Sequence, residues 1–238
     1  MPELPEVETV RRGLEGALVG VVISSVVLHR KNLRTPFPKG FEKSLAGRKI
    51  TAIKRRAKYL LFYFDTDIVL IAHLGMTGRF SVLKNKDNKL GAHDHVVFNL
   101  ADGRSLIYND PRRFGLMDIC KLSEVESHKL FVHLGPEPLE DKFTEKYLQN
   151  ALSKRGTPIK PTIMEQKIVV GVGNIYANEA LFIAGISPLK PANEIGKKMG
   201  LLIPCIHNVL NDAIKAGGST LKDFAHVSGE SGYFQHSF

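Results

Sequence analysis

Two hydrophobic periodicities divide this sequence, and a proline-rich stretch separates them. From residue 21 to about residue 121, short runs of β-branched and aromatic residues alternate with turn residues, which favours antiparallel pairing and a β-sandwich. Asp102-Gly103, between two of these runs, is typical of a hairpin turn. Residues 133–139 contain two prolines and a glycine, and the pattern beyond them is helical. The sequence therefore predicts an α+β fold.

We predict three parts: an N-terminal domain over 1–132, a linker or hinge over 133–139 and a helical domain over 140–238. The N-terminal domain should begin with a helix, because Val7, Val10, Leu14 and Leu18 recur at helical spacing before Gly20. Further helices are predicted over 145–152, 159–166, 174–184 and 197–216, with a short one after Ser219. We find no internal repeat.

The charge balance indicates a polyanionic partner. The 238 residues include 33 Lys+Arg and 24 Asp+Glu, a formal net charge of +9. Ribosomal and membrane-surface proteins share this bias, so charge alone does not choose among them. The sequence has no run of 18 apolar residues and no secretory signal pattern, so we expect a cytoplasmic protein without a membrane partner. Cys120 and Cys205 stand far apart in apolar runs, which indicates buried free thiols.

The first eight residues, MPELPEVE, concentrate unusual chemistry at the amino end. Removal of Met1 would leave Pro2 as a secondary amine, a nucleophile whose adduct with a sugar carbon is a cationic iminium and thus an electron sink. Glu3 is placed to move protons for that amine. The competing interpretation is a capped helix with proline at its first position and Glu6 and Glu8 in its favoured first turn.

Basic residues gather in Lys54-Arg55-Arg56-Ala57-Lys58-Tyr59. Strand alternation would send Lys54, Arg56 and Lys58 to one face of a sheet. Such a face could bind an anion, or it could be a solvated edge that discourages aggregation.

Several turns also carry candidate functional residues. Met76 lies between two glycines after an apolar strand, and Arg112 and Phe114 lie in Asp110-Pro111-Arg112-Arg113-Phe114-Gly115, which could instead be a turn with a core phenylalanine. Asn174 follows two glycines, where it could cap a helix whose free N–H groups bind phosphate. His93 and His95 could share a strand face, but no third ligand of metal spacing accompanies them, so we expect no metal site in this chain.

Together these motifs resemble the bacterial formamidopyrimidine-DNA glycosylases, in the expected order along almost the whole chain. The resemblance implies a base-excision-repair enzyme that removes oxidised purines, including 8-oxoguanine and formamidopyrimidines, and then nicks the strand as an apurinic/apyrimidinic lyase. It implies that Pro2 is the nucleophile that forms the Schiff base, that Glu3 is the acid/base, and that Lys58 assists proton transfer. The substrate would be double-stranded DNA, bound by a monomer at the bacterial nucleoid.

The resemblance also assigns DNA contacts. It implies that His93, Arg155 and Asn174 bind phosphates, Asn174 within a helix–two-turn–helix, and that Met76, Arg112 and Phe114 fill the gap left by the everted base. Arg112 would pair with the orphaned base. Eversion costs stacking and pairing energy, which an aromatic blade and a guanidinium would offset. The stretch SGESGYFQ at 228–235 would be the loop over the lesion.

Two departures from the family bear on these expectations. The family continues into a four-cysteine zinc finger with a late arginine, and this sequence has neither, so we expect no cofactor in this chain. The sequence also retains Met1, which would block the Pro2 amine. The alternatives are therefore a non-catalytic protein that binds damaged DNA and a basic RNA-binding protein, although the latter leaves the amino end and Arg112–Phe114 without a role.

Overall fold

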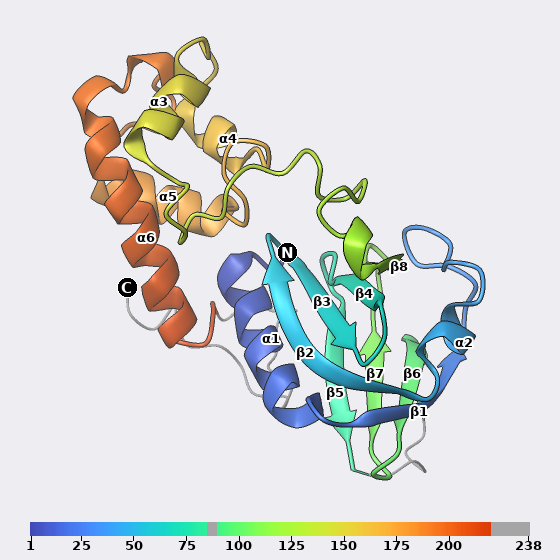
Figure 1. The fold of residues 1–238 in the computed structure, drawn as a ribbon. Helices are drawn as coiled ribbons and strands as arrows, with labels where there is room; N and C mark the ends of the chain where they lie inside the picture. The colour runs from blue at the N-terminus through green and yellow to red at the C-terminus, as the bar shows by residue number, and fades with distance from the viewer. Residues whose placement is uncertain (85–89, 220–238) are drawn as a thin grey trace.

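The computed structural model describes residues 1–84 and 90–219. The predicted helix after Ser219 and the loop at 228–235 lie outside the described residues. Figure 1 shows a strand-rich part and a helical part, joined by a long connection after β8. The strands are β1 Val22–Leu28, β2 Arg48–Arg56, β3 Tyr59–Phe64, β4 Ile68–His73, β5 Arg79–Leu83, β6 Asp94–Leu100, β7 Ser105–Asn109 and β8 Leu116–Lys121.

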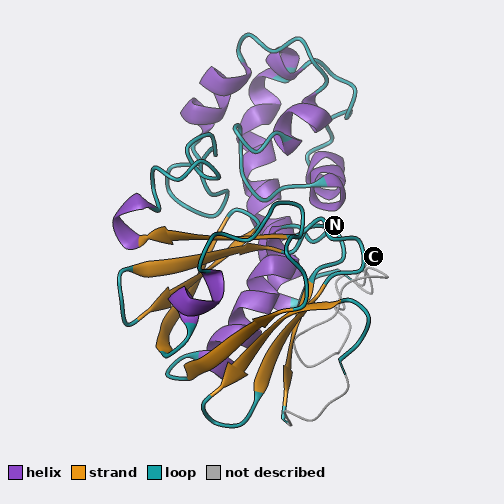
Figure 2. Ribbon diagram, turned by 90° about the vertical axis from the view of Figure 1, so that its right-hand side faces the viewer, coloured by secondary structure: helices purple, strands orange, loops and turns teal. Residues whose placement is uncertain are grey.

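The strands form one antiparallel sheet in the order β5-β7-β6-β1-β2-β3-β4-β8, which folds over into two layers (Figure 2). The bend lies where β1 meets β2, which pair only through Val22–Lys49 and Ile23–Arg48. Phe62 of β3 and Phe80 of β5 lie far apart in the strand order, yet their ring centroids are 5.8 Å apart. The two halves therefore enclose one apolar core, and the predicted β-sandwich is confirmed.

The helical predictions are confirmed with small differences at the ends. The helix predicted over 159–166 ends at Met164, and the one predicted from residue 197 begins as a 3₁₀ turn. A short helix between β1 and β2 was not predicted, because it lies inside the strand-rich region. The helices are α1 Leu4–Leu18, α2 Phe41–Leu45, α3 Glu145–Leu152, α4 Ile159–Met164, α5 Asn174–Ile183 and α6 Met199–Lys215, with 3₁₀ turns η1 Leu122–Glu124, η2 Ala192–Glu194 and η3 Gly196–Lys198.

Helix α1 belongs to both parts of the molecule. Val7, Val10, Leu14 and Leu18 lie on one face and are buried in the core of the sandwich. Leu4, at the first turn, is instead buried in the core formed by α3 to α6. The amino end of α1 is therefore fixed at the junction of the two parts, as Figure 1 shows.

The predicted linker at 133–139 is hydrogen-bonded on both sides. Arg56 Nη2 donates to the Gly135 carbonyl at 2.7 Å, on the sandwich side. On the helical side, the Gly135 N–H donates to the Gln166 carbonyl at 2.8 Å, and the Val170 N–H donates to the Pro136 carbonyl at 3.1 Å. The linker is thus fixed to both parts, and the limits 1–132, 133–139 and 140–238 stay a prediction. In the described part of the chain no helix is long and apolar enough to cross a membrane.

Candidate active site

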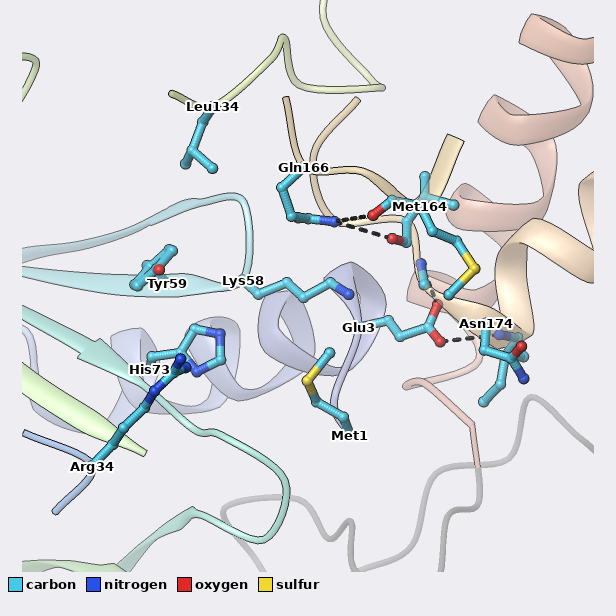
Figure 3. Close-up of a pocket in the computed structure, with 13 residues that line it drawn as sticks. Met1, Glu3, Arg34, Lys58, Tyr59, His73, Leu134, Met164, Gln166 and Asn174 are labelled. Atoms are coloured by element: carbon cyan, nitrogen blue, oxygen red, sulfur yellow. Dashed lines mark hydrogen bonds between the residues drawn. The ribbon is translucent and has the colours of Figure 1, made fainter. Parts of the chain in front are cut away.

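A cavity of about 560 Å³ lies at this junction, where the start of α1, the β2–β3 turn, the end of β4 and the segment before α5 meet. Its lining brings together residues that are far apart in sequence, several of them titratable. Figure 3 shows Lys58 and Glu3 extending toward one another across the cavity. The polar lining includes Glu3, Arg34, Lys58, His73, Gln166 and Asn174.

The Glu3 carboxylate is bound to the start of α5. Its oxygens accept hydrogen bonds from the backbone N–H groups of Gly173 at 2.8 Å and Ile175 at 3.0 Å. Burial raises the pKa of Glu3, while Lys58 and the α5 N–H groups act in the opposite direction. The expectation that Asn174 caps this helix is wrong, because Gly173 is the N-cap and Glu3 supplies the acceptor. The N–H groups that Glu3 occupies are therefore not free for phosphate.

Lys58 is the basic member of the cavity, and it does not lie in a strand. Strand β2 ends at Arg56 and β3 begins at Tyr59, so Lys58 occupies the turn between them. Its side chain is only 5% exposed. Burial lowers the pKa of Lys58, and the charges of Glu3 and Glu6 partly offset this. Burial thus shifts both members of the Glu3–Lys58 pair toward their neutral forms.

The predicted basic face of Lys54, Arg56 and Lys58 is wrong for Lys58, which lies outside β2, and the cations at the end of β2 contact acidic and aromatic groups. Arg55 Nη1 and Arg56 Nη1 contact the Glu137 carboxylate at 2.6 and 3.0 Å. The Lys54 ammonium lies 5.2 Å from the centroid of the Tyr63 ring. The alternation argument failed because the chain turns after Arg56, which separates Lys58 from the strand.

Pro2 is buried at the start of α1, and its nitrogen is in the peptide bond to Met1. The Met1 side chain is half-exposed and lines the cavity beside Glu3 and Lys58 (Figure 3). Removal of Met1 would therefore open the cavity and free the nitrogen at the same place.

Glu6, in the first turn of α1 close to Glu3, is fully buried. One oxygen accepts the Glu3 N–H at 2.8 Å. The other accepts the Tyr176 hydroxyl, and also the Ser219 N–H and hydroxyl at 2.8 and 3.0 Å. Glu6 therefore joins α1 to α5 and to Ser219, which lies four residues beyond the end of α6, at a single carboxylate.

A second cavity, of about 420 Å³, adjoins the first and contains Met76 and Phe114. Phe114 is 46% exposed, so the alternative of a core phenylalanine is wrong. The guanidinium of Arg112 lies 4.8 Å from the centroid of its ring. Gly75 allows the two turns to meet, since a Cβ there would lie 2.4 Å from the Phe114 carbonyl carbon. The structure thus brings Met76, Arg112 and Phe114 together beside the first cavity.

A buried carboxylate holds these two turns in place. Asp110 Oδ1 accepts the Thr77 hydroxyl at 2.6 Å, and Oδ2 accepts the Gly115 N–H at 2.9 Å. Thr77 Oγ1 in turn accepts the Arg112 N–H at 3.1 Å. The loop that carries Phe114 is therefore held both by a bond within its own motif and by Thr77 of the other turn.

His93 and Arg155 lie outside both cavities. His93 is exposed and precedes β6, whereas His95 is buried with Nε2 at 2.8 Å from the Asp110 carbonyl oxygen. Although His93 lies just before the strand, the two rings are neighbours, with centroids 6.4 Å apart. Arg155 donates to both oxygens of Glu165, at 2.8 and 2.9 Å.

The cysteines do not fit the structural zinc that the family resemblance implies. Cys120 is buried on β8, as predicted, whereas Cys205 is only half-buried and packs against the helical core, so the prediction of a buried thiol is wrong there. Burial raises the pKa of the Cys120 thiol to about 11, which disfavours the thiolate that metal ions require. Among the described residues, no three His, Cys, Asp or Glu side chains are grouped to hold a metal ion.

Sequence reasoning missed three residues of the first cavity. His73 Nδ1 accepts the Gly75 N–H at 2.9 Å, which leaves Nε2 to carry the proton. Burial, with the charges of Lys58 and Arg34, lowers the pKa of His73 to about 4. Gln166 accepts the Gly171 N–H at 2.9 Å and so holds the segment before α5. His73 ends a buried strand beside Met76, which is a usable signal, but Arg34 and Gln166 had none.

Comparison with known proteins agrees with this arrangement. Residues 1–117 match the family model for the formamidopyrimidine-DNA glycosylase N-terminal domain, and residues 134–225 match the one for its H2TH domain. Formamidopyrimidine-DNA glycosylases of Ruegeria sp. (strain TM1040) and Azorhizobium caulinodans are 48% and 47% identical, with all of this chain and 87% of each relative covered. Their matched length therefore spans both parts of the fold.

Solved structures also match this chain over almost its whole length. The wild-type Lactococcus lactis Fpg in complex with DNA containing N7-benzyl-Fapy-dG has a TM-score of 0.91 and 38% sequence identity. A complex of the same enzyme with DNA containing an abasic site has the same two values. Each comparison covers 99% of this chain and 86% of the other.

Proposed function

Because this chain belongs to the formamidopyrimidine-DNA glycosylase family and is a base-excision-repair DNA glycosylase, we propose that it removes 8-oxoguanine and formamidopyrimidines from double-stranded DNA. In the proposal, it then nicks the strand at the abasic site. The observation that carries the proposal is the Glu3–Lys58 pair, held in a cavity at the buried amino end of α1. The net charge of +9 suits a DNA substrate, and hence work at the bacterial nucleoid.

Pro2 is the proposed nucleophile once Met1 has been removed. Its nitrogen forms a bond to C1′ of the everted nucleotide, the bond from C1′ to the base breaks, and the base leaves with the bonding electrons and a proton. Opening of the sugar ring at O4′ then gives an iminium, which acidifies the hydrogen on C2′. Loss of that proton gives an enamine, whose electrons then restore the iminium and form a C2′–C3′ double bond as the C3′–O bond breaks and the 3′ phosphate leaves.

Glu3 and Lys58 are the proposed proton carriers for these steps. Burial raises the pKa of the Glu3 carboxyl, which makes its carboxylate a better proton acceptor than an ordinary glutamate and suits it to pass a proton to O4′ or to the departing base. An amine whose pKa is lowered can accept a proton, and when charged it can hold a phosphate. Their mutual attraction keeps both groups at the same place in the cavity.

The proposed DNA contacts lie on both sides of the pair. Asn174, exposed at the start of α5, is proposed to bind the backbone beside the lesion, and His73 adds a neutral Nε2–H donor. Arg155 and His93 are proposed to bind phosphates further away, for which Arg155 would exchange its bond to Glu165. Met76, Arg112 and Phe114 are proposed to fill the gap left by the everted base.

Borohydride trapping on DNA with an abasic site tests the nucleophile. Protein whose mass shows that Met1 is gone should become covalently attached to the DNA, and Pro2→Gly should slow the attachment. Glu3→Gln should mainly slow release of 8-oxoguanine. Rapid trapping by protein that still carries Met1 would refute the role of Pro2 and indicate another amine, such as Lys58.

The alternative function is a non-catalytic protein that binds damaged DNA. It would apply to protein that keeps Met1, because Met1 lines both cavities and its peptide bond holds the Pro2 nitrogen in an amide. Tight binding to abasic DNA by protein lacking Met1, without any trapping, would establish this alternative.

A further inference from the structure

The linker carries a buried carboxylate that the proposed mechanism does not use. Glu137 is only 5% exposed. Its Oε2 accepts from Arg55 Nη1 at 2.6 Å, while Oε1 accepts from Arg56 Nη1 at 3.0 Å and from the Ala57 N–H at 2.6 Å. Both oxygens therefore act as acceptors, and the three donors are the last two residues of β2 and Ala57, the first residue of the turn that carries Lys58.

The Ala57 backbone explains why this turn needs support. Its φ is +53°, in the left-handed region that costs an ordinary L-residue about 1–2 kcal/mol. Such a conformation persists where surrounding contacts hold it. The bond from the Ala57 N–H to Glu137 is one such contact, and the bond from Arg55 Nη1 to the Ala57 carbonyl at 2.9 Å is another. The direction of the next residue, Lys58, follows from this conformation.

We propose that Glu137 is a positioning residue: it holds Ala57 in the left-handed conformation and thereby directs the Lys58 ammonium into the cavity toward Glu3. The proposal rests on the proposed function, because Lys58 matters only if the cavity performs the chemistry. Glu137 itself touches no reacting group and is absent from the cavity lining.

The same linker also reaches the opposite wall of the cavity. The Gly135 N–H donates to the Gln166 carbonyl at 2.8 Å. The Gln166 side chain donates to the Val172 carbonyl at 3.3 Å, next to the Gly173 N–H that binds Glu3. One short segment therefore contacts both walls of the cavity: Gly135 holds the wall that binds Glu3, and Glu137 holds the turn that carries Lys58. A change in the linker would alter the spacing of the pair.

Glu137→Gln tests the proposal with little change of shape. An amide has one acceptor oxygen, so its NH₂ group must face either Arg55 or the Arg56 and Ala57 donors. Single-turnover trapping on pre-formed abasic DNA should slow by about 10- to 100-fold, because small misplacement of a proton-transfer group has effects of this size. The matched control is Glu8→Gln, since Glu8 also binds Arg55, at 3.3 Å, but has no bond to Ala57.

Two further measurements separate positioning from general damage. Thermal unfolding identifies variants that fail to fold, and a double variant with Ala57→Gly relieves the left-handed strain, so it should recover at least part of the lost rate. In lysine-labelled protein, the ¹³Cε titration of Lys58 should show its pKa moving upward in Glu137→Gln, as the ammonium leaves its buried place. The variants keep the other charged and titratable groups around Lys58, which are Glu3, Glu6, His73 and Arg34.

The outcomes are distinct. If wild-type protein without Met1 does not trap, the proposed function fails. If wild type traps, but folded Glu137→Gln traps at the same rate with the same Lys58 titration, the positioning role is refuted. Equal slowing by Glu8→Gln, or no recovery with Ala57→Gly, would also overturn it, since the Arg55 charge and not the turn would then be responsible.

Discussion

Gly173→Ala should separate the Glu3 carboxylate from the start of α5, although Glu3 itself is not substituted. An added Cβ would lie 2.4 Å from Glu3 Cδ and 2.5 Å from Glu3 Oε1, closer than atoms tolerate. The backbone of Gly173 has φ −130°, so alanine fits the local conformation and the effect is steric. The flexible Glu3 carboxylate is what must move.

The magnitude follows from the bonds that Glu3 would lose. Two hydrogen bonds to a charged acceptor, at 2.8 and 3.0 Å, hold the carboxylate. Each stabilises by about 1.5–3 kcal/mol, and because the cavity admits water that replaces part of this, we expect a loss of about 2–4 kcal/mol in unfolding free energy. Excision of 8-oxoguanine should fall by about 10²-fold, as expected when a catalytic group is displaced by about 1 Å.

Urea denaturation measures the stability, and single-turnover cleavage of duplexes with 8-oxoguanine measures the excision. Gly16→Ala is the matched control, because it lies in α1 with open space around its Cβ. This control should be neutral or more stable by up to about 1 kcal/mol. Wild-type stability and excision in Gly173→Ala would refute the binding of Glu3 to the start of α5.

Three further outcomes are expected. Arg155→Ala should weaken binding to all duplexes and make the salt dependence shallower by about one unit in a log–log plot. Arg112→Ala should instead reduce discrimination by the base opposite the lesion in competition binding; equal rescaling by both variants would contradict these roles. The pKa of His73 is about 4 in the fold against 6.5 ordinarily, so the unfolded chain binds the proton more readily. The free energy of unfolding should therefore be highest above pH 6.5 and should fall as the pH falls toward 4. His73→Gln should flatten that part of the stability profile by at most about 3 kcal/mol, as measured by urea denaturation at each pH.

Local patterns predicted the parts of this molecule whose causes are local. The α1 stripe, the hairpin at Asp102-Gly103 and the helix over 145–152 depend on nearby residues, and the structure has them. These elements needed no knowledge of the rest of the chain. The turn that carries Phe114 is local only in part, since Asp110 accepts from Gly115 in its own motif but also from Thr77, 33 positions away.

Long-range pairs could not be predicted in this way. Glu3 replaces Asn174 as the cap of α5 from 170 residues away along the chain. Arg56 was predicted to lie on a basic face with Lys54 and Lys58, and nothing in its neighbourhood announces its partner Glu137, 81 positions later. Left-handed Ala57 carries no sequence signal either, since alanine rarely adopts that conformation. In each case the nearby sequence does not show which distant residue binds the group.

The buried Glu6 has a consequence for the order of synthesis. Its carboxylate receives donors from Tyr176 and from Ser219, and the latter is 213 positions away. During translation, the first turn of the chain therefore waits until nearly all of the described residues have left the ribosome before its partners exist. Contacts of such separation form late, because closing the loop costs entropy before any contact repays it. The end of the chain that is made first therefore completes its hydrogen bonds only after Ser219 has been made, so the catalytic centre cannot be finished before then.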